Sequence, residues 1–344
     1  METKELLRTL SEAVGVAGLE GGAVECAKRL AEPYVRKLTT DPSGNLIAEV
    51  WPAQQGQPHI LLDAHIDEIG MIVTSVEENG FLHVSNCGGV DRKVLLAQEV
   101  VIHGKEELVG VISSKPPHLA SADDAKKTPE MDEILIDTGL LTERVKQLIS
   151  PGDRVTVQGC FRELLGDRVS GKALDDRAGV AALIKAAELL QGEPCSCGLT
   201  LLLSTQEETG TRGATTGGFA VQPDIALSVD VSFALTSDAP EHKCGKMGEG
   251  AMIGVSPTLD AGITNQLIEI AERCGIPHQL EVMGGETSTN ADVISLAGSG
   301  VKTGLCSIPL RYMHTPIETI AVADVDAVAR LLAEFVREAG KQNA

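Results

Sequence analysis

An apolar run that ends in two adjacent acids most constrains the fold of this chain. Residues 199–203 read LTLLL, and the segment STQEETG follows at residues 204–210. A short, mostly apolar run closed by glycine predicts a buried strand. Because neighbouring side chains on a strand point to opposite sides, we expect Glu207 and Glu208 to face different partners, one a metal ion and one the reacting molecule. Acid pairs are common on protein surfaces, so this interpretation depends on the other clusters of ligand-type residues.

A histidine and an aspartate follow another predicted strand, at residues 59–63. The end of this strand carries His65 and Asp67. An imidazole can bind a metal while a nearby carboxylate holds its second N–H and fixes its tautomer. A surface histidine beside acids explains this fragment about equally well.

Further ligand-type residues lie beside three other predicted elements. Asp175 and Asp176 stand between a glycine turn and a helix predicted over residues 180–190. They could simply cap that helix, but this explains one aspartate better than two, and a carboxylate here could bridge two cations. Asp230 ends a predicted strand, where an ordinary turn aspartate is the alternative, and His314 lies just past another one.

The sequence pattern of the chain changes between residues 71 and 166. Short alternating segments are split there by Gly, Asn and Asp, and helical periodicity is nearly absent. On either side of this stretch, helical patterns alternate with strand patterns, which is typical of an α/β domain. We therefore expect an α/β domain made of residues 1–70 and 167–344, with a small β-rich domain, residues 71–166, inserted into it.

Charge and composition exclude several classes of function. The formal net charge of −20 argues against non-specific nucleic-acid binding and against attraction to an anionic membrane surface. The N-terminus is charged and lacks an apolar signal core, and no apolar segment approaches membrane-spanning length. The eight cysteines are spread through the chain. These observations predict a reduced, cytoplasmic protein.

Taken together, the ligand-type residues form a set suited to two metal ions. Ligands of open α/β sheets bind outside the carboxyl ends of the strands, so segments far apart in sequence can converge there. Two histidines and three carboxylates without cysteine suit Zn²⁺, Co²⁺ or Mn²⁺. The members of this set are His65, Asp175, Glu208, Asp230 and His314. A two-metal site with one bridging carboxylate activates a shared water and polarises a carbonyl, which leaves Glu207 as the general base.

The same segments, in the same order, resemble the tetrahedral (TET) aminopeptidase family. This family is the cytoplasmic glutamyl- and deblocking-aminopeptidase group of dinuclear metallopeptidases. The resemblance spans nearly the whole chain and is carried by the segments AHIDEIG at 64–70, KALDDRAG at 172–179, QEETG at 206–210, SVD at 228–230 and RYMHTP at 311–316.

The resemblance implies a role for each residue of the site. His65 and Asp230 would be the terminal ligands of one divalent ion, and Glu208 and His314 would hold the second. Asp175 would bridge the two ions. Zn²⁺ or Co²⁺ would be the usual metal, with Mn²⁺ as an alternative.

Catalysis and architecture are implied in the same way. Glu207 would be the general base, and Asp67 would hold His65 in place. The fold would be a mixed central sheet flanked by helices, as in zinc peptidases, with a β-barrel-like inserted domain that serves dimerisation. Dimers of the family assemble into hollow dodecamers, so that short peptides reach the sites and folded proteins do not. We therefore expect a homo-oligomeric metallo-aminopeptidase that removes N-terminal residues from short peptides.

The chain departs from the family pattern at three places. Val90 stands where the family commonly has Trp, residues 249–251 read EGA in place of Lys-Gly-Pro, and Asn290 replaces an Asp. These departures bear on substrate preference and assembly. An acidic first residue of the substrate would require Arg or Lys in its pocket and a basic one Asp or Glu, and the sequence favours neither.

Two other functions fit parts of the sequence. Proteins that resemble this family have been called endoglucanases, and two carboxylates could serve a glycoside hydrolase. That chemistry needs no histidine ligands, however, and glycan grooves usually use aromatic platforms, whereas Phe, Tyr and Trp make up only 2% of this chain. A catalytically inactive assembly protein that keeps the fold is the second alternative.

Overall fold

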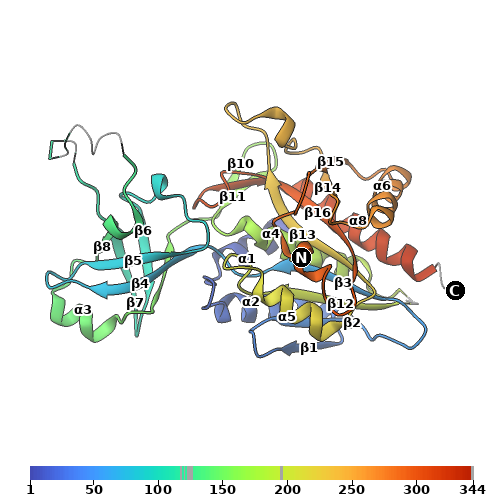
Figure 1. The fold of residues 1–344 in the computed structure, drawn as a ribbon, viewed down its shortest axis with the longest axis horizontal. Coiled ribbons are helices and arrows are strands. Elements are labelled where there is room, and N and C mark those ends of the chain that lie inside the picture. Colours follow the sequence, from blue (N-terminus) through green and yellow to red (C-terminus); the bar gives the residue numbers. More distant parts are fainter. Residues whose placement is uncertain (117, 120, 122–126, 194–196, 342–344) are drawn as a thin grey trace.

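The computed structural model describes residues 1–116, 118–119, 121, 127–193 and 197–341 and has two parts. Figure 1 shows a larger part in which helices flank a sheet, with a smaller β-structure projecting beside it. Each helix among the described residues is too short or too polar to span a membrane. The expected α/β fold with a mixed central sheet and an inserted barrel is confirmed.

The larger part is built on one mixed sheet. Across the described residues this sheet has 11 strands in the order β1-β2-β12-β3-β13-β16-β17-β11-β10, with β14 beside β16 and β15 beside β14. Its strands are β1 (Lys37–Thr40), β2 (Leu46–Trp51), β3 (His59–His65), β10 (Arg162–Leu164), β11 (Arg168–Gly171), β12 (Gly198–Ser204), β13 (Ile225–Phe233), β14 (Ala251–Val255), β15 (His278–Val282), β16 (Lys302–Arg311) and β17 (Glu318–Ala321).

The centre of the sheet is parallel and buried. β12, β3, β13 and β16 run parallel to one another. Every residue of β12 is buried, as its continuous apolar sequence predicts for a strand covered on both faces. The carboxyl ends of these four strands therefore lie at one edge of the sheet, where ligands of such sheets gather.

Helices cover both faces of this sheet. A large cluster of buried apolar side chains joins one face of the sheet to most of the helices. Two short helices, α5 and α7, pack on Leu61 and Leu202 of the other face. The helices of the larger part are α1 (Thr3–Glu12), α2 (Gly21–Ala31), α4 (Leu174–Leu189), α5 (Arg212–Val221), α6 (Ala261–Cys274), α7 (Asn290–Ile294) and α8 (Val322–Lys341).

The smaller part is a closed barrel with its own core. Six antiparallel strands close in the order β4-β5-β8-β7-β6-β9 around buried aliphatic side chains. The barrel elements are β4 (Gly70–Val76), β5 (Leu82–Cys87), β6 (Glu99–His103), β7 (Glu107–Ile112), β8 (Leu135–Asp137), β9 (Arg154–Val157) and the helix α3 (Thr142–Leu148). β10 falls inside the range 71–166 expected for the insertion, yet it pairs with β11 of the larger sheet.

Candidate metal centre and active site

Two clusters of histidine and carboxylate side chains share Asp175. In the first cluster, ligand atoms of His65, Asp175 and Asp230 lie within 4.8 Å of one another, and in the second the same holds for Asp175, Glu208 and His314. One carboxylate oxygen of Asp175 lies 3.1 Å from Nε2 of His65, and the other lies 3.3 Å from Nε2 of His314. Asp175 therefore has the geometry of a bridging ligand. The structure brings together all of the ligands expected from the sequence.

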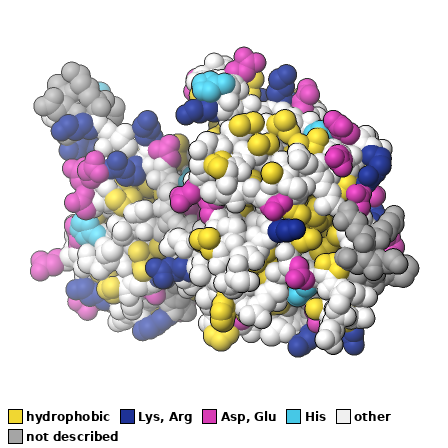
Figure 2. Space-filling view, turned by 45° about the vertical axis from the view of Figure 1, so that its right-hand side comes forward, with side chains coloured by type: hydrophobic (Ala, Val, Ile, Leu, Met, Phe, Trp, Pro, Cys, Tyr) yellow, Lys and Arg dark blue, Asp and Glu magenta, His cyan; other side chains and the backbone are white. Residues whose placement is uncertain are grey.

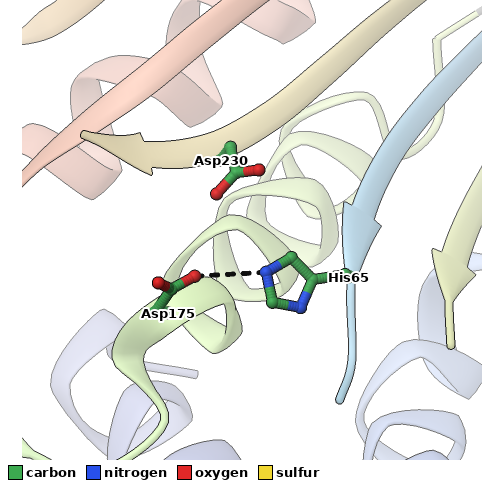
Figure 3. Close-up of side chains that lie close together, drawn as sticks. All are labelled: His65, Asp175 and Asp230. Carbon is green, nitrogen blue, oxygen red and sulfur yellow. Dashed lines mark hydrogen bonds and ion pairs between the residues drawn. The ribbon is translucent and has the colours of Figure 1, made fainter. Parts of the chain in front are cut away.

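The first cluster is assembled from two neighbouring strands and one helix. Figure 3 shows His65, Asp175 and Asp230 pointing toward one another. His65 is the last residue of β3, and Asp175 lies at the start of α4. Asp230 lies within β13, three residues before the strand ends, rather than at the end predicted from the sequence. Because β3 and β13 are paired and parallel, their side chains at this edge are neighbours.

Asp176 supports the site without joining either cluster. Its peptide bond to Asp175 is cis. One carboxylate oxygen accepts the Gly179 N–H at 3.0 Å, and the other accepts the main-chain N–H of His65 at 3.3 Å. The helix-capping explanation for the aspartate pair thus applies to Asp176, and Asp175 is the residue left to face the histidines.

The two histidines each present Nε2 to the carboxylates. Nδ1 of His65 lies 3.2 Å from the carbonyl oxygen of Asp67 and 3.4 Å from its carboxylate, and Nδ1 of His314 lies 2.8 Å from the carbonyl oxygen of Gly89. A carbonyl oxygen can only accept, so Nδ1 carries the proton in both rings. Nε2 is then unprotonated in the neutral ring and can bind a metal.

The prediction that Glu207 and Glu208 lie on a strand was wrong. β12 ends at Ser204, and the two glutamates lie in the turn that follows, after Gln206 with a φ of 55°. Strand alternation therefore does not separate their directions. The turn is held by Asp67, whose two carboxylate oxygens accept the main-chain N–H groups of Glu207 at 3.0 Å and Glu208 at 3.2 Å.

A loop of the barrel packs directly on the second cluster. Beyond the Gly89 hydrogen bond, a Cβ at Gly88 would lie 2.9 Å from Glu208 Oε2, and a Cβ at Gly89 would lie 2.7 Å from His314 Nδ1. Only glycine lets the main chain approach the two ligands this closely. Sequence reasoning missed this role, although the adjacent glycines were a signal that could have indicated it.

Glu318 is the second residue that sequence reasoning missed. Its carboxylate, 2% exposed, accepts the main-chain N–H of Asp175 at 3.1 Å and that of His314 at 2.9 Å. It therefore ties the bridging candidate to a ligand of the second cluster. Its nearness to His314 in sequence was the available signal.

The departures from the family pattern lie outside both clusters. Val90 lines a small cavity together with Glu208 and His314, and Glu249 is exposed. Asn290 is buried, and its side-chain amide donates to Ser204 Oγ at 2.8 Å.

Negative charge is concentrated here beyond what the protein itself neutralises. Burial, together with repulsion from Asp175 and Glu207, raises the pKa of Asp230 well above its usual range. Burial alone would lower the pKa of His314, but hydrogen bonds to Asp175 and Glu208 outweigh it and raise the value to about 11. Buried carboxylates of this kind are stabilised when they are paired with a cation or coordinate a metal. Nitrogen and oxygen donors without sulfur fit divalent ions such as Zn²⁺, Co²⁺ or Mn²⁺.

The clusters line a cleft large enough for a peptide end. The cleft has a volume of about 770 Å³, and Glu207 lines it beside the ligands. Its other walls include residues of β13, β14, β15 and β16, the loop that follows β15, and the short helix η5 (Glu241–Lys243). Burial is the largest influence on Glu207 and, together with repulsion from neighbouring acids, raises its pKa to about 7 despite the nearby His65.

Comparisons with known proteins place the chain among peptidases. Residues 44–331 match the M42 glutamyl aminopeptidase family. The chain is 31% identical to the lysyl aminopeptidase of Pyrococcus furiosus, over 97% of this chain and 96% of that protein.

Solved structures agree with the match. A TET aminopeptidase from the marine sediment archaeon Thaumarchaeota archaeon SCGC AB-539-E09 is similar with a TM-score of 0.92 and 30% identity, covering 99% of both chains. The TET1 peptidase of Pyrococcus horikoshii, which can assemble into a tetrahedron or a large octahedral shell, is similar with a TM-score of 0.86 and 30% identity, covering 97% of this chain and 99% of that one.

Proposed function

Because this chain belongs to the M42 glutamyl aminopeptidase family, we propose that it releases N-terminal residues from short peptides with two divalent metal ions and a glutamate base. It is an aminopeptidase, a hydrolase of a metal-dependent family. The arrangement of Asp175 carries the rest of the proposal, because each of its carboxylate oxygens faces a different histidine.

The proposed ligands divide evenly between two ions. His65 and Asp230 would hold one ion, Glu208 and His314 would hold the other, and Asp175 would be shared. Bound divalent ions polarise a carbonyl and lower the pKa of water, which is the chemistry that peptide hydrolysis requires. Zn²⁺ and Co²⁺ are the metals we propose first, with Mn²⁺ as the alternative.

Glu207 is the proposed general base. Its pKa of about 7 keeps a substantial fraction of the carboxylate able to accept a proton near neutral pH. It takes a proton from the attacking water and returns it to the leaving amine. Asp67 acts as a positioning residue, because it holds both the turn that carries Glu207 and the ring of His65.

We further propose that the chain forms homo-oligomers. The assembly of the similar TET1 peptidase supports this proposal. The inserted barrel is the proposed dimerisation domain, and a dodecamer assembled from dimers is the expected size. The molecular mass measured by light scattering tests the assembly. Substitutions on the barrel surface that prevent contact between subunits should yield smaller oligomers.

Metal content measured together with hydrolysis of aminoacyl anilides tests the main proposal. We expect about two ions per chain and release of the first residue that chelators abolish and added Zn²⁺ or Co²⁺ restores. Two bound ions without hydrolysis of any peptide would overturn the substrate assignment and favour an inactive assembly protein. Chelator-resistant hydrolysis of glucans would instead support the glycoside hydrolase alternative.

A further inference from the structure

We propose that Glu281 recognises the side chain of a basic first residue, so that this enzyme prefers Lys or Arg at the peptide N-terminus. Glu281 lies on β15, and its side chain lines the cleft that contains the two clusters. This inference rests on the proposed function and adds the substrate class to it.

Two serines fix the Glu281 carboxylate in the cleft. One of its oxygens accepts a hydrogen bond from Ser232 Oγ, and the other accepts one from Ser307 Oγ at 2.6 Å. Both serines are buried, at 8% and 1% exposure. The carboxylate is therefore held in one orientation before any substrate arrives, which reduces the entropy that binding would cost.

The serines also place Glu281 next to the first metal cluster. Ser232 follows Asp230 by two positions on β13, so their side chains point to the same face of the sheet. Ser307 of β16 is the direct register partner of Asp230. Glu281 therefore lies over the same face of the sheet as Asp230, and it contacts Ser307, the residue paired with that proposed ligand.

Apolar side chains beside Glu281 suit the stem of a long cation. Leu305 precedes Ser307 by two positions on β16, and Met252 of β14 pairs with Ser307 in register. Both residues line the cleft. A Lys or Arg side chain could pack its methylene groups on this wall while its charged end meets Glu281.

The remaining acceptor capacity of Glu281 matches a cation. A carboxylate offers about four acceptor positions, and the two serines occupy only two of them. An ammonium or guanidinium group can use the others in charge-assisted hydrogen bonds. His242 and Lys243 also line the cleft, but they lie exposed on η5, without the buried hydroxyl partners that fix Glu281. An acidic first residue would meet a fixed like charge, which excludes it.

Hydrolysis of Lys-, Arg-, Leu- and Glu-anilides by the metal-loaded protein tests this proposal. The wild type should show kcat/KM values for Lys and Arg at least about tenfold above that for Glu. Glu281→Gln, which keeps the size and a hydrogen-bonding end, should lower kcat/KM for Lys and Arg about tenfold or more while changing Leu less than about twofold. Glu286→Gln, which changes an exposed acid of the same cleft, should keep the ratio of Lys to Leu.

The outcomes separate this inference from the function on which it rests. Equal losses for Lys and Leu in Glu281→Gln would show a structural role and overturn the inference. A wild type that prefers Glu or Leu to Lys would overturn it too, while the aminopeptidase assignment stood. Failure to release any residue from a metal-loaded protein would refute the proposed function itself. Glu281→Lys adds a positive test, because it should shift the preference toward Glu.

Discussion

The carbonyl oxygen of Gly89 lies 2.8 Å from Nδ1 of His314, although 225 residues separate them and they belong to different parts of the molecule. The loop that carries Gly89 connects β5 to β6 of the barrel, whereas His314 follows β16 of the main sheet. The barrel therefore helps to orient a proposed metal ligand, in addition to any role in assembly. Hydrogen bonds of this kind fix the tautomer of a metal-binding histidine.

Gly89→Ala should weaken the second metal position. The added Cβ would lie 2.7 Å from His314 Nδ1 and 2.9 Å from Cε1, so either the ring or the loop must move. We expect metal affinity or kcat/KM to fall about 10- to 100-fold. Isothermal titration of the metal-free protein with Zn²⁺ would show one weakened site and one unchanged site.

Gly21→Ala is the matched control for this variant, because a Cβ at Gly21 meets nothing within 4 Å. It should titrate like the wild type. If Gly89→Ala bound both ions normally, the barrel loop would have no role in the centre.

Asp67→Asn should reduce turnover with little change in substrate binding. The amide can accept with only one of its two end atoms, so one of the N–H groups of Glu207 and Glu208 loses its partner. The base and a ligand then shift together. We expect kcat to fall about 10- to 100-fold, with KM nearly unchanged, in steady-state assays at saturating metal.

Asp260→Asn provides the control for Asp67→Asn. Asp260 also accepts a main-chain N–H, that of Ile263 at the start of α6, and Asn caps helices equally well. Its kinetics should match the wild type. An equal loss of kcat in both variants would mean that general destabilisation, and not the position of the base, explains the effect.

The convergence of the ligands could be predicted from the sequence because it follows from a general property of parallel sheets. The apolar runs before His65 and Glu208 identify buried strands, and parallel strands must deliver their carboxyl ends to one edge. The path of the main chain beyond the end of β12 could not be predicted in the same way. The direction of the Glu207 side chain depends on the left-handed backbone conformation of Gln206 and on Asp67, which lies 140 positions earlier in the chain.

Supporting contacts between distant segments were not predictable for a similar reason. The carbonyl oxygen of Gly89 accepts from the side chain of His314, and the carboxylate of Glu318 accepts the main-chain N–H of Asp175. Hydrophobic periodicity carries no information about such contacts. The Glu281–Ser232–Ser307 contacts likewise depend on the register of three strands. A residue's type and spacing indicate what it can bind, whereas its partner is decided by the tertiary fold.

Glu318→Gln should loosen the bridging ligand. Each carboxylate oxygen accepts one main-chain N–H, from Asp175 and from His314, and the amide nitrogen of Gln would face one of these donors with a donor of its own. We expect kcat/KM to fall about 10- to 100-fold, with partial recovery at high Zn²⁺ because the metal restores the position of its ligands. Thr319→Val is the control, because this neighbouring change on β17 removes only a hydrogen bond to Ile317. Its kcat/KM should not change when metal is added.

Removal of the metal should lower the stability of the folded protein. The unoccupied clusters would leave buried carboxylates without neutralising cations, as the raised pKa of Asp230 indicates. At a free metal concentration of 100 times Kd, linkage adds about 2.7 kcal/mol to the free energy of unfolding for each site. Urea denaturation with and without chelator measures this difference, which should vanish in Asp175→Ala because both ions lose their shared ligand. A chelator effect of full size in Asp175→Ala would contradict the bridging role.

Glu207→Gln separates the proposed base from the proposed ligands. The amide cannot accept the proton of water, so we expect kcat to fall roughly 10²- to 10⁴-fold. Glu207 belongs to neither ligand cluster, so the variant should still bind two ions. His65→Ala provides the contrast, because it should lose both turnover and metal. Metal analysis by mass spectrometry alongside single-turnover kinetics distinguishes the two variants. If Glu207→Gln kept near-normal turnover, another group must accept the proton; if it lost metal as His65→Ala does, Glu207 would be a ligand and not the base.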